Sequence, residues 1–131
     1  MGVVIAIDPG REKCGVAVVS DQGALDKSVV SPDRLPEIIP DLIARHSAEV
    51  IIIGDGTHGR ELADRLRGMA GALPIEFVDE SYTTLKARTR FFQENPPKGL
   101  LRLIPRGLLT PSRPIDDLAA VILAEDYLAR P

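Results

Sequence analysis

The sequence predicts a single α/β domain spanning residues 1–131, with a mixed five-stranded sheet covered by helices on both faces. Three strand-like segments open the chain, and helix-like and strand-like segments then alternate. This order is typical of a sheet that begins antiparallel and continues parallel. The length of 131 residues is that of one domain able to bury a sizeable core.

The first three strands are expected to form an antiparallel meander. The apolar run 3–7 ends at Asp8-Pro9-Gly10, which indicates a strand buried on both faces and followed by a tight turn. A second strand is predicted over 14–20 and a third over 24–30, joined by a short turn that contains Gly23.

The remaining elements follow from helical spacing and from further apolar runs. Apolar residues between 35 and 43 predict a helix with Pro36 or Pro40 in its first turn, where a missing N–H costs nothing. The expected elements after it are a buried strand over 50–53, a helix carrying Leu62, Leu66 and Met69, a strand over 75–78, a helix up to about Phe92, and a last helix over 115–128. Between them, the segment 95–114 holds five of the 11 prolines and is predicted to be a loop.

Composition excludes several classes of protein. The net charge of −3 means that a polyanion would have to be held by a local basic patch or by bound metal ions. Aromatic residues make up 4% of the chain, which argues against stacking platforms for single-stranded bases. No apolar run is long enough to span a bilayer, and the N-terminus has no signal-peptide shape. The single cysteine, Cys14, fits a reducing compartment, so we expect a cytoplasmic protein without a membrane partner.

Three carboxylates from distant segments are the candidate catalytic and metal-binding residues. Asp8 ends the first strand, Glu80 follows the fifth, and Asp116 opens the last helix. Sites in open α/β sheets form at the carboxyl ends of strands, and Mg²⁺ and Mn²⁺ prefer carboxylate oxygens. Two such ions about 3.5–4 Å apart can stabilise both the attacking and the leaving oxygen of a phosphodiester. For each acid taken singly, a helix cap or a solvated surface group is the alternative.

Two further acids lie beside this set. Asp117 is expected to be a first-turn acid that interacts with the helix dipole, while the small Ala119 and Ala120 let the Asp116 face approach the sheet. Asp55 follows the fourth strand, and we interpret it as a helix N-cap in preference to a fourth metal ligand.

Candidate substrate contacts surround the acids. Lys13 lies in a glycine-flanked turn after Asp8 and could hold a phosphate. Gly56 and Thr57 precede a helix, whose N-terminus favours anions. For the turn after Asp8, an ordinary β-hairpin with surface charges is the alternative.

The loop is the expected substrate patch, because its cations have no acid among them and arginine suits phosphate oxygens. These cations are Lys98, Arg102, Arg106 and Arg113. Several leucines and isoleucines of the same stretch need burial, so a structural lid or a dimer contact is the alternative. They are Leu100, Leu101, Leu103, Ile104, Leu108 and Leu109.

Taken together, these motifs resemble the YqgF family, also called RuvX, of the RNase H-like superfamily. The resemblance covers nearly the whole chain. It consists of Ile7-Asp8-Pro9-Gly10 with Lys13 and Gly15-Val16-Ala17, Ile51-Ile52-Ile53-Gly54, Val78-Asp79-Glu80 with Thr83-Thr84 and Ala87-Arg88, and Ile115-Asp116 with Ala119-Ala120 and Ile122-Leu123.

The resemblance implies an RNase H-like fold and divalent-metal catalysis by Asp8, Glu80 and Asp116, and Arg88 is predicted to contact substrate. Members are associated with maturation of the 5′ end of 16S ribosomal RNA and were proposed as Holliday-junction resolvases; dimers are common among related resolvases. The chain departs from the usual pattern after the fourth strand, and also at Asp79-Glu80-Ser81, where many members have Asp-Glu-Arg.

The expected function is therefore that of a Mg²⁺- or Mn²⁺-dependent nuclease that processes the 5′ end of pre-16S rRNA. A Holliday junction resolvase acting on branched DNA and a non-catalytic nucleic-acid-binding assembly module are the alternatives. A fragment of an actin-like ATPase is disfavoured, since that fold needs two such domains. The sequence does not distinguish RNA from DNA, and a homodimer is an open alternative to a monomer.

Overall fold

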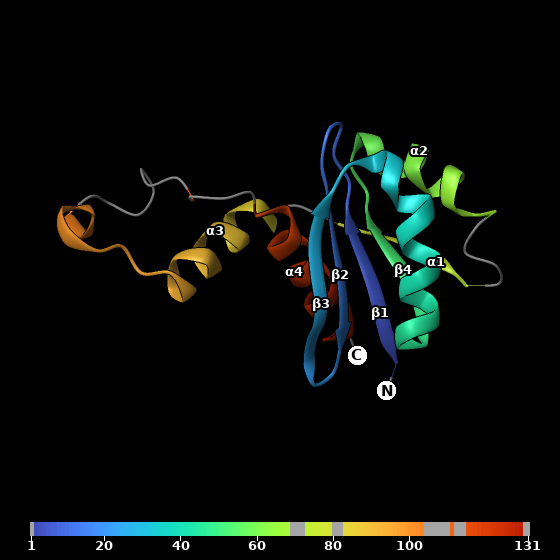
Figure 1. The fold of residues 1–131 in the computed structure, drawn as a ribbon, viewed down its shortest axis with the longest axis horizontal. Coiled ribbons are helices and arrows are strands. Elements are labelled where there is room, and N and C mark those ends of the chain that lie inside the picture. Colours follow the sequence, from blue (N-terminus) through green and yellow to red (C-terminus); the bar gives the residue numbers. More distant parts are fainter. Residues whose placement is uncertain (1, 69–72, 80–82, 104–110, 112–114, 130–131) are drawn as a thin grey trace.

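A five-stranded sheet with helices on both faces forms the body of the molecule (Figure 1). The computed structural model describes residues 2–68, 73–79, 83–103, 111 and 115–129, with the backbone alone at 57, 83, 84, 101 and 102. The elements in chain order are β1 (Val3–Asp8), β2 (Cys14–Ser20), β3 (Gly23–Val30), the 3-10 helix η1 (Pro32–Arg34), α1 (Leu35–His46), β4 (Ala48–Gly54), α2 (Thr57–Leu66), β5 (Ile75–Val78), α3 (Thr83–Glu94), the 3-10 helix η2 (Gly99–Leu103) and α4 (Asp116–Leu128).

The strand order is β3-β2-β1-β4-β5. β1 pairs with β2, and β2 with β3, in antiparallel fashion, whereas β4 runs parallel to both β1 and β5. The predicted mixed sheet is thereby confirmed. β1 lies at the centre of the sheet. Because β1, β4 and β5 run parallel, their carboxyl ends share one edge.

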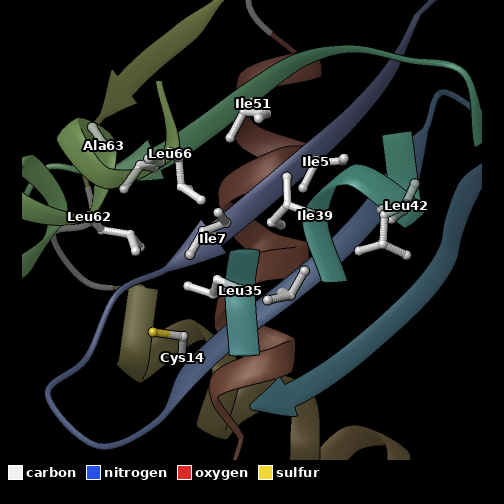
Figure 2. Packing of buried hydrophobic residues seen from close by; sticks show 13 residues of the cluster. Ile5, Ile7, Cys14, Leu35, Ile39, Leu42, Ile51, Leu62, Ala63 and Leu66 are labelled. Atoms are coloured by element: carbon white, nitrogen blue, oxygen red, sulfur yellow. The ribbon is translucent and has the colours of Figure 1, made fainter. Parts of the chain in front are cut away.

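Alternation along the strands divides the core between the two faces of the sheet. Ile5 and Ile7 of β1 pack with α1 and α2, whereas Val4 and Ala6 pack with α4. Figure 2 shows the first of these clusters between the sheet and the helices α1 and α2, with α4 behind the sheet. A strand buried on both faces reads as a continuous apolar run, which explains the composition of β1 and β4.

Helix α3 packs on α4 and projects beyond the sheet (Figure 1). Phe91 and Phe92 lie against Leu118 and Ile122 of α4. Polar contacts add to this interface. The guanidinium of Arg90 donates a 2.6 Å hydrogen bond to the Glu125 carboxylate, and the Lys86 ammonium lies 3.1 Å from the Asp126 carboxylate.

Several local predictions needed correction. Pro36 lies in the first turn of α1 as expected, but Pro40 lies inside the helix. Asp55 is not the N-cap of α2: Gly56 is, without a side-chain cap bond, because the chain reaches helical geometry one residue later. The predicted loop contains η2.

The leucines of η2 also differ from expectation. Leu100 is 82% exposed and Leu103 is 81% exposed, because η2 lies far from the sheet (Figure 1). Burial of these two side chains within the chain is therefore not observed, and the dimer contact named as an alternative stays a prediction. In the part of the chain that the structure describes, no helix has both the length and the apolar character needed to cross a membrane.

Candidate active site

The carboxylate of Asp8 is positioned by the alternation of β1. Val4 and Ala6 of this strand face α4, and successive side chains of a strand point to opposite faces. Asp8 therefore belongs to the α4 face, at the end of the central strand. Its register partner on β2 is Gly15, whose neighbours on the same face are Ala17 and Val19.

Gly15 brings the start of α4 onto this point. A Cβ atom at Gly15 would overlap the backbone carbonyl of Asp116 and would lie 2.9 Å from the nitrogen of Asp117. The first residue of α4 thus lies directly over the strand pair that carries Asp8. Cross-strand partners have Cα atoms about 4.5–5.5 Å apart, so residues 8 and 116 meet at one edge of the sheet although 108 positions separate them in the sequence.

Small side chains continue this close approach along α4. Ala120 and Ala124 are fully buried and pack against Ala6 and Ala17 of the sheet. The expected role of Ala120 is thereby confirmed. Ala119 instead faces α3, since it lies about 100° around the helix from Ala120.

Asp117 is a first-turn acid, as predicted, but it is only 6% exposed. Its carboxylate accepts a 2.9 Å hydrogen bond from the backbone N–H of Leu118. A carboxylate in the first turn interacts favourably with the helix dipole, so we assign Asp117 to the stability of the N-terminus of α4.

Glu80, the third predicted acid, lies outside the described residues. Val78, two residues before it, ends β5 with its side chain in the α4-face cluster. Across the described ranges, no group of three or more histidine, cysteine, aspartate and glutamate side chains could hold a metal ion. The two described members of the predicted set, Asp8 and Asp116, supply carboxylate oxygens, which fit Mg²⁺ and Mn²⁺.

The thiol of Cys14 lies within the electrostatic range of both described acids. Burial raises the pKa of its thiol, and the charges of Asp8 and Asp116 raise that pKa further. The hydrogen bond from Sγ to the Gly10 carbonyl (3.7 Å) and the charge of Arg65 act in the opposite direction. Both carboxylates are thus close enough for their charges to act on a single thiol.

We predict that this thiol is unreactive in the folded chain. Cys14 is 1% exposed, and its raised pKa keeps it neutral, whereas the thiolate is the reactive form. Modification by a disulfide reagent at neutral pH should be roughly a hundredfold or more slower than in urea, because it requires local opening. The same shift adds stability that is fully present below the unfolded pKa of the thiol and is lost as the pH rises through the folded one. Equal rates of thiol modification with and without urea would contradict the prediction that Cys14 is unreactive.

The predicted phosphate contacts lie on two turns beside the acids. In the turn from β1 to β2, Gly10 is needed because a Cβ atom would overlap the carbonyl of Lys13, whose side chain is exposed. In the first turn of α2, a Cβ atom at Gly59 would overlap the Gly54 carbonyl at the end of β4. Gly56, at the N-cap, and Thr57 therefore follow the carboxyl end of β4 closely.

The predicted substrate patch is described only in part. Lys98 is exposed, the backbone of Arg102 belongs to η2, and Arg106 and Arg113 lie outside the described residues. Arg88 is half-buried on α3 and has an interaction partner. The structure therefore brings Asp8 and Asp116 together and leaves the patch as a prediction.

Comparisons with known proteins identify the family of the chain. A family model described as "RuvX: Holliday junction resolvase" matches residues 2–130. The chain belongs to the RuvX family. Two curated relatives, each named "Putative pre-16S rRNA nuclease", resemble this RuvX chain over nearly their whole lengths. The protein from Porphyromonas gingivalis is 25% identical, covering 100% of this chain and 99% of its own; the one from Thermus thermophilus is 29% identical, covering 95% and 96%.

Solved structures support the fold of this RuvX member. Thermus thermophilus RuvC superposes with a TM-score of 0.57 at 17% identity, covering 96% of this chain and 95% of that one. The same protein in complex with a Holliday junction substrate gives 0.55 at 18% identity, covering 98% and 95%. The RNase H-like fold implied by the motifs is thereby confirmed.

Proposed function

We propose that this RuvX chain is a nuclease that requires Mg²⁺ or Mn²⁺ and hydrolyses phosphodiester bonds in structured RNA, with 5′ processing of pre-16S rRNA as its role. The observation that carries the proposal is the meeting of Asp8 and Asp116 through Gly15. Carboxylate oxygens from separate chain segments are the ligands that a hard divalent cation prefers. The names of the two curated relatives support the choice of substrate.

Asp8, Glu80 and Asp116 are the proposed metal ligands and catalytic residues. A bound divalent ion would supply Lewis-acid stabilisation of charge on the phosphate. Asp8 comes from the rigid centre of the sheet, and Asp116 from a helix whose start is fixed by Gly15. Rigid elements keep such side chains within the small tolerances that metal sites require.

The remaining predicted residues are proposed to hold the substrate. Lys13 would steady the phosphate beside Asp8, with the backbone of Gly56 and Thr57 near a second phosphate. Arg88 and the basic residues of 95–114 would bind the phosphates of the RNA that flanks the cleavage site. Such contacts position a nucleic acid without reading its sequence. The basic residues in question are Lys98, Arg102, Arg106 and Arg113. A cytoplasmic location and a homodimer also stay predictions.

Cleavage of a Holliday junction is the second candidate function. The description of the matching family favours it. A purely structural nucleic-acid-binding module has less support, because acidic side chains at the contact point repel a polyanion, whereas a bound metal ion attracts it.

One experiment separates these functions. The protein is incubated with Mg²⁺ or Mn²⁺ and one of three end-labelled substrates: a precursor 16S rRNA fragment, the same fragment with a mature 5′ end, or a four-way DNA junction. We expect cleavage of the precursor alone and none in EDTA. Preferential cleavage of the junction would favour the resolvase. Absence of cleavage of every substrate with either metal would reject the enzyme.

A further inference from the structure

A pocket of about 270 Å³ lies on the opposite side of the sheet from α4, beside the same turn that follows Asp8. Its walls are the turn from β1 to β2, η1, and one face of α2. His58, Glu61 and Arg65 line it from α2, at the three- and four-residue spacing that puts side chains on one helix face. That spacing identifies one wall of the pocket from the sequence, but not the turn and η1 that complete it.

Two arginines on separate elements give the pocket its positive charge. Arg11, on the turn, is exposed and forms no ion pair with any residue in the described ranges. The Arg65 guanidinium lies 3.8 Å from the carboxylate of Asp33, whose side chain is 92% exposed. An ion pair so exposed is weak, so Arg65 can exchange Asp33 for a ligand at little cost.

The other lining residues restrict what the pocket can accept. Leu62, Pro32 and Cys14 supply apolar surface, and Glu61 supplies a carboxylate. A bare inorganic anion would be repelled by that carboxylate. A ligand with a phosphate and a neighbouring hydroxyl satisfies both kinds of group, since the hydroxyl can donate to Glu61 while the phosphate lies against the arginines.

We propose that this pocket binds one ribonucleotide of the substrate strand, with its phosphate between Arg11 and Arg65 and its 2′-hydroxyl on Glu61. The inference rests on the proposed nuclease function and adds a subsite that would select ribose over deoxyribose. The 2′-hydroxyl is the group by which a protein distinguishes RNA from DNA at a given site. The volume of about 270 Å³ lies just below the range of ordinary ligand pockets, about 300–1,000 Å³, which suits a single nucleotide unit.

The position of the pocket relative to Asp8 supports a continuous strand. Pro9 and Gly10 line the pocket, and Gly10 is only two residues beyond Asp8, so their Cα atoms are at most about 7 Å apart. Asp8 faces α4, whereas Cys14 at the other end of the turn belongs to the α2 face. A strand cleaved above Asp8 would therefore cross the turn and enter the pocket.

The test measures binding in EDTA, so that it does not depend on cleavage. The affinity of the labelled precursor fragment is measured by fluorescence anisotropy over a series of salt concentrations. Arg11→Gln and Arg65→Gln should each weaken binding roughly three- to tenfold, as for an exposed charge-assisted contact. The double variant should lower the slope of log affinity against log salt by about 1, the value for one phosphate.

Two control variants change residues near Arg65 that do not line the pocket. Arg67→Gln removes an equal charge from an exposed residue of the α2 C-terminus that pairs with Asp64 and does not line the pocket; it should bind like wild type. Asp33→Asn removes the partner of Arg65 but keeps the cation, and should bind equally well or better. Should Arg65→Gln fail to fold, Arg11→Gln, in an exposed turn, still decides.

The ribose assignment has its own variant. Glu61→Gln should bring the ratio of affinities for RNA and for a DNA strand of the same sequence closer to one. An unchanged ratio would overturn the role of Glu61. If Arg11→Gln and Arg65→Gln bind with the same affinity and salt slope as Arg67→Gln, the pocket is not a substrate site. This holds even if the wild type cleaves. Tighter binding of adenosine monophosphate than of the strand would reassign the pocket to a free nucleotide. If the pocket variants change RNA binding as expected but the wild type cleaves no substrate, the nuclease proposal is rejected and the binding pocket stands.

Discussion

Replacing Asp8 with asparagine is expected to reduce cleavage of the precursor fragment by about 10²–10³-fold, the usual cost of losing one preorganised charged group in an active site. Asparagine keeps the size of the side chain and removes its charge. Asp8 is half-buried at the end of β1 and asparagine has nearly the same shape, so the free energy of unfolding should change little. Single-turnover cleavage in Mn²⁺ and urea denaturation measure the two effects.

The matched control is Asp55→Asn, which changes the same residue type at the same edge of the sheet. Asp55 is exposed, and its backbone N–H donates a 2.9 Å hydrogen bond to the Val78 carbonyl, which the substitution leaves intact. Its cleavage rate should stay close to that of the wild type. Full activity in Asp8→Asn, or an equal loss in both variants, would contradict the assignment of Asp8 to the metal site.

The fold could be predicted because its signals are local. The continuous apolar runs of β1 and β4 follow from burial on both faces, and the mixed sheet follows from the order of elements. The choice of Asp116 over Asp117 also followed from helical geometry, since two consecutive residues point about 100° apart. The structure places the backbone of both residues close to Gly15, so the choice of Asp116 as the ligand stays a prediction.

The misses depend on tertiary contacts that spacing does not encode. Leu100 and Leu103 look like core residues by composition, yet η2 lies beyond the body of the domain and exposes both. Asp55 has the chemistry of an N-cap, but Gly56 occupies that position. The pocket joins Arg11 of a turn to Arg65 of a helix, and no local pattern connects two residues so far apart in sequence.

The convergence of the acids makes Gly15→Ala the most damaging small substitution that the structure predicts. The added Cβ would overlap the backbone carbonyl of Asp116, and backbone cannot swing aside as a flexible side chain can. We expect a loss of about 3 kcal/mol or more in the free energy of unfolding, at the upper end of the cost of overpacking. Chemical denaturation followed by circular dichroism measures the loss.

Gly68→Ala is the control, because a Cβ atom there would meet nothing within 4 Å; its stability should be close to that of the wild type. If α4 instead shifts away to accommodate the alanine, part of the stability survives. Even then the shift moves Asp116 away from Asp8, and Mn²⁺-dependent cleavage should fall more than the folded fraction does. A Gly15→Ala protein with normal stability and normal cleavage would mean that α4 does not contact β2 at this point. In that case nothing described would hold residues 8 and 116 together.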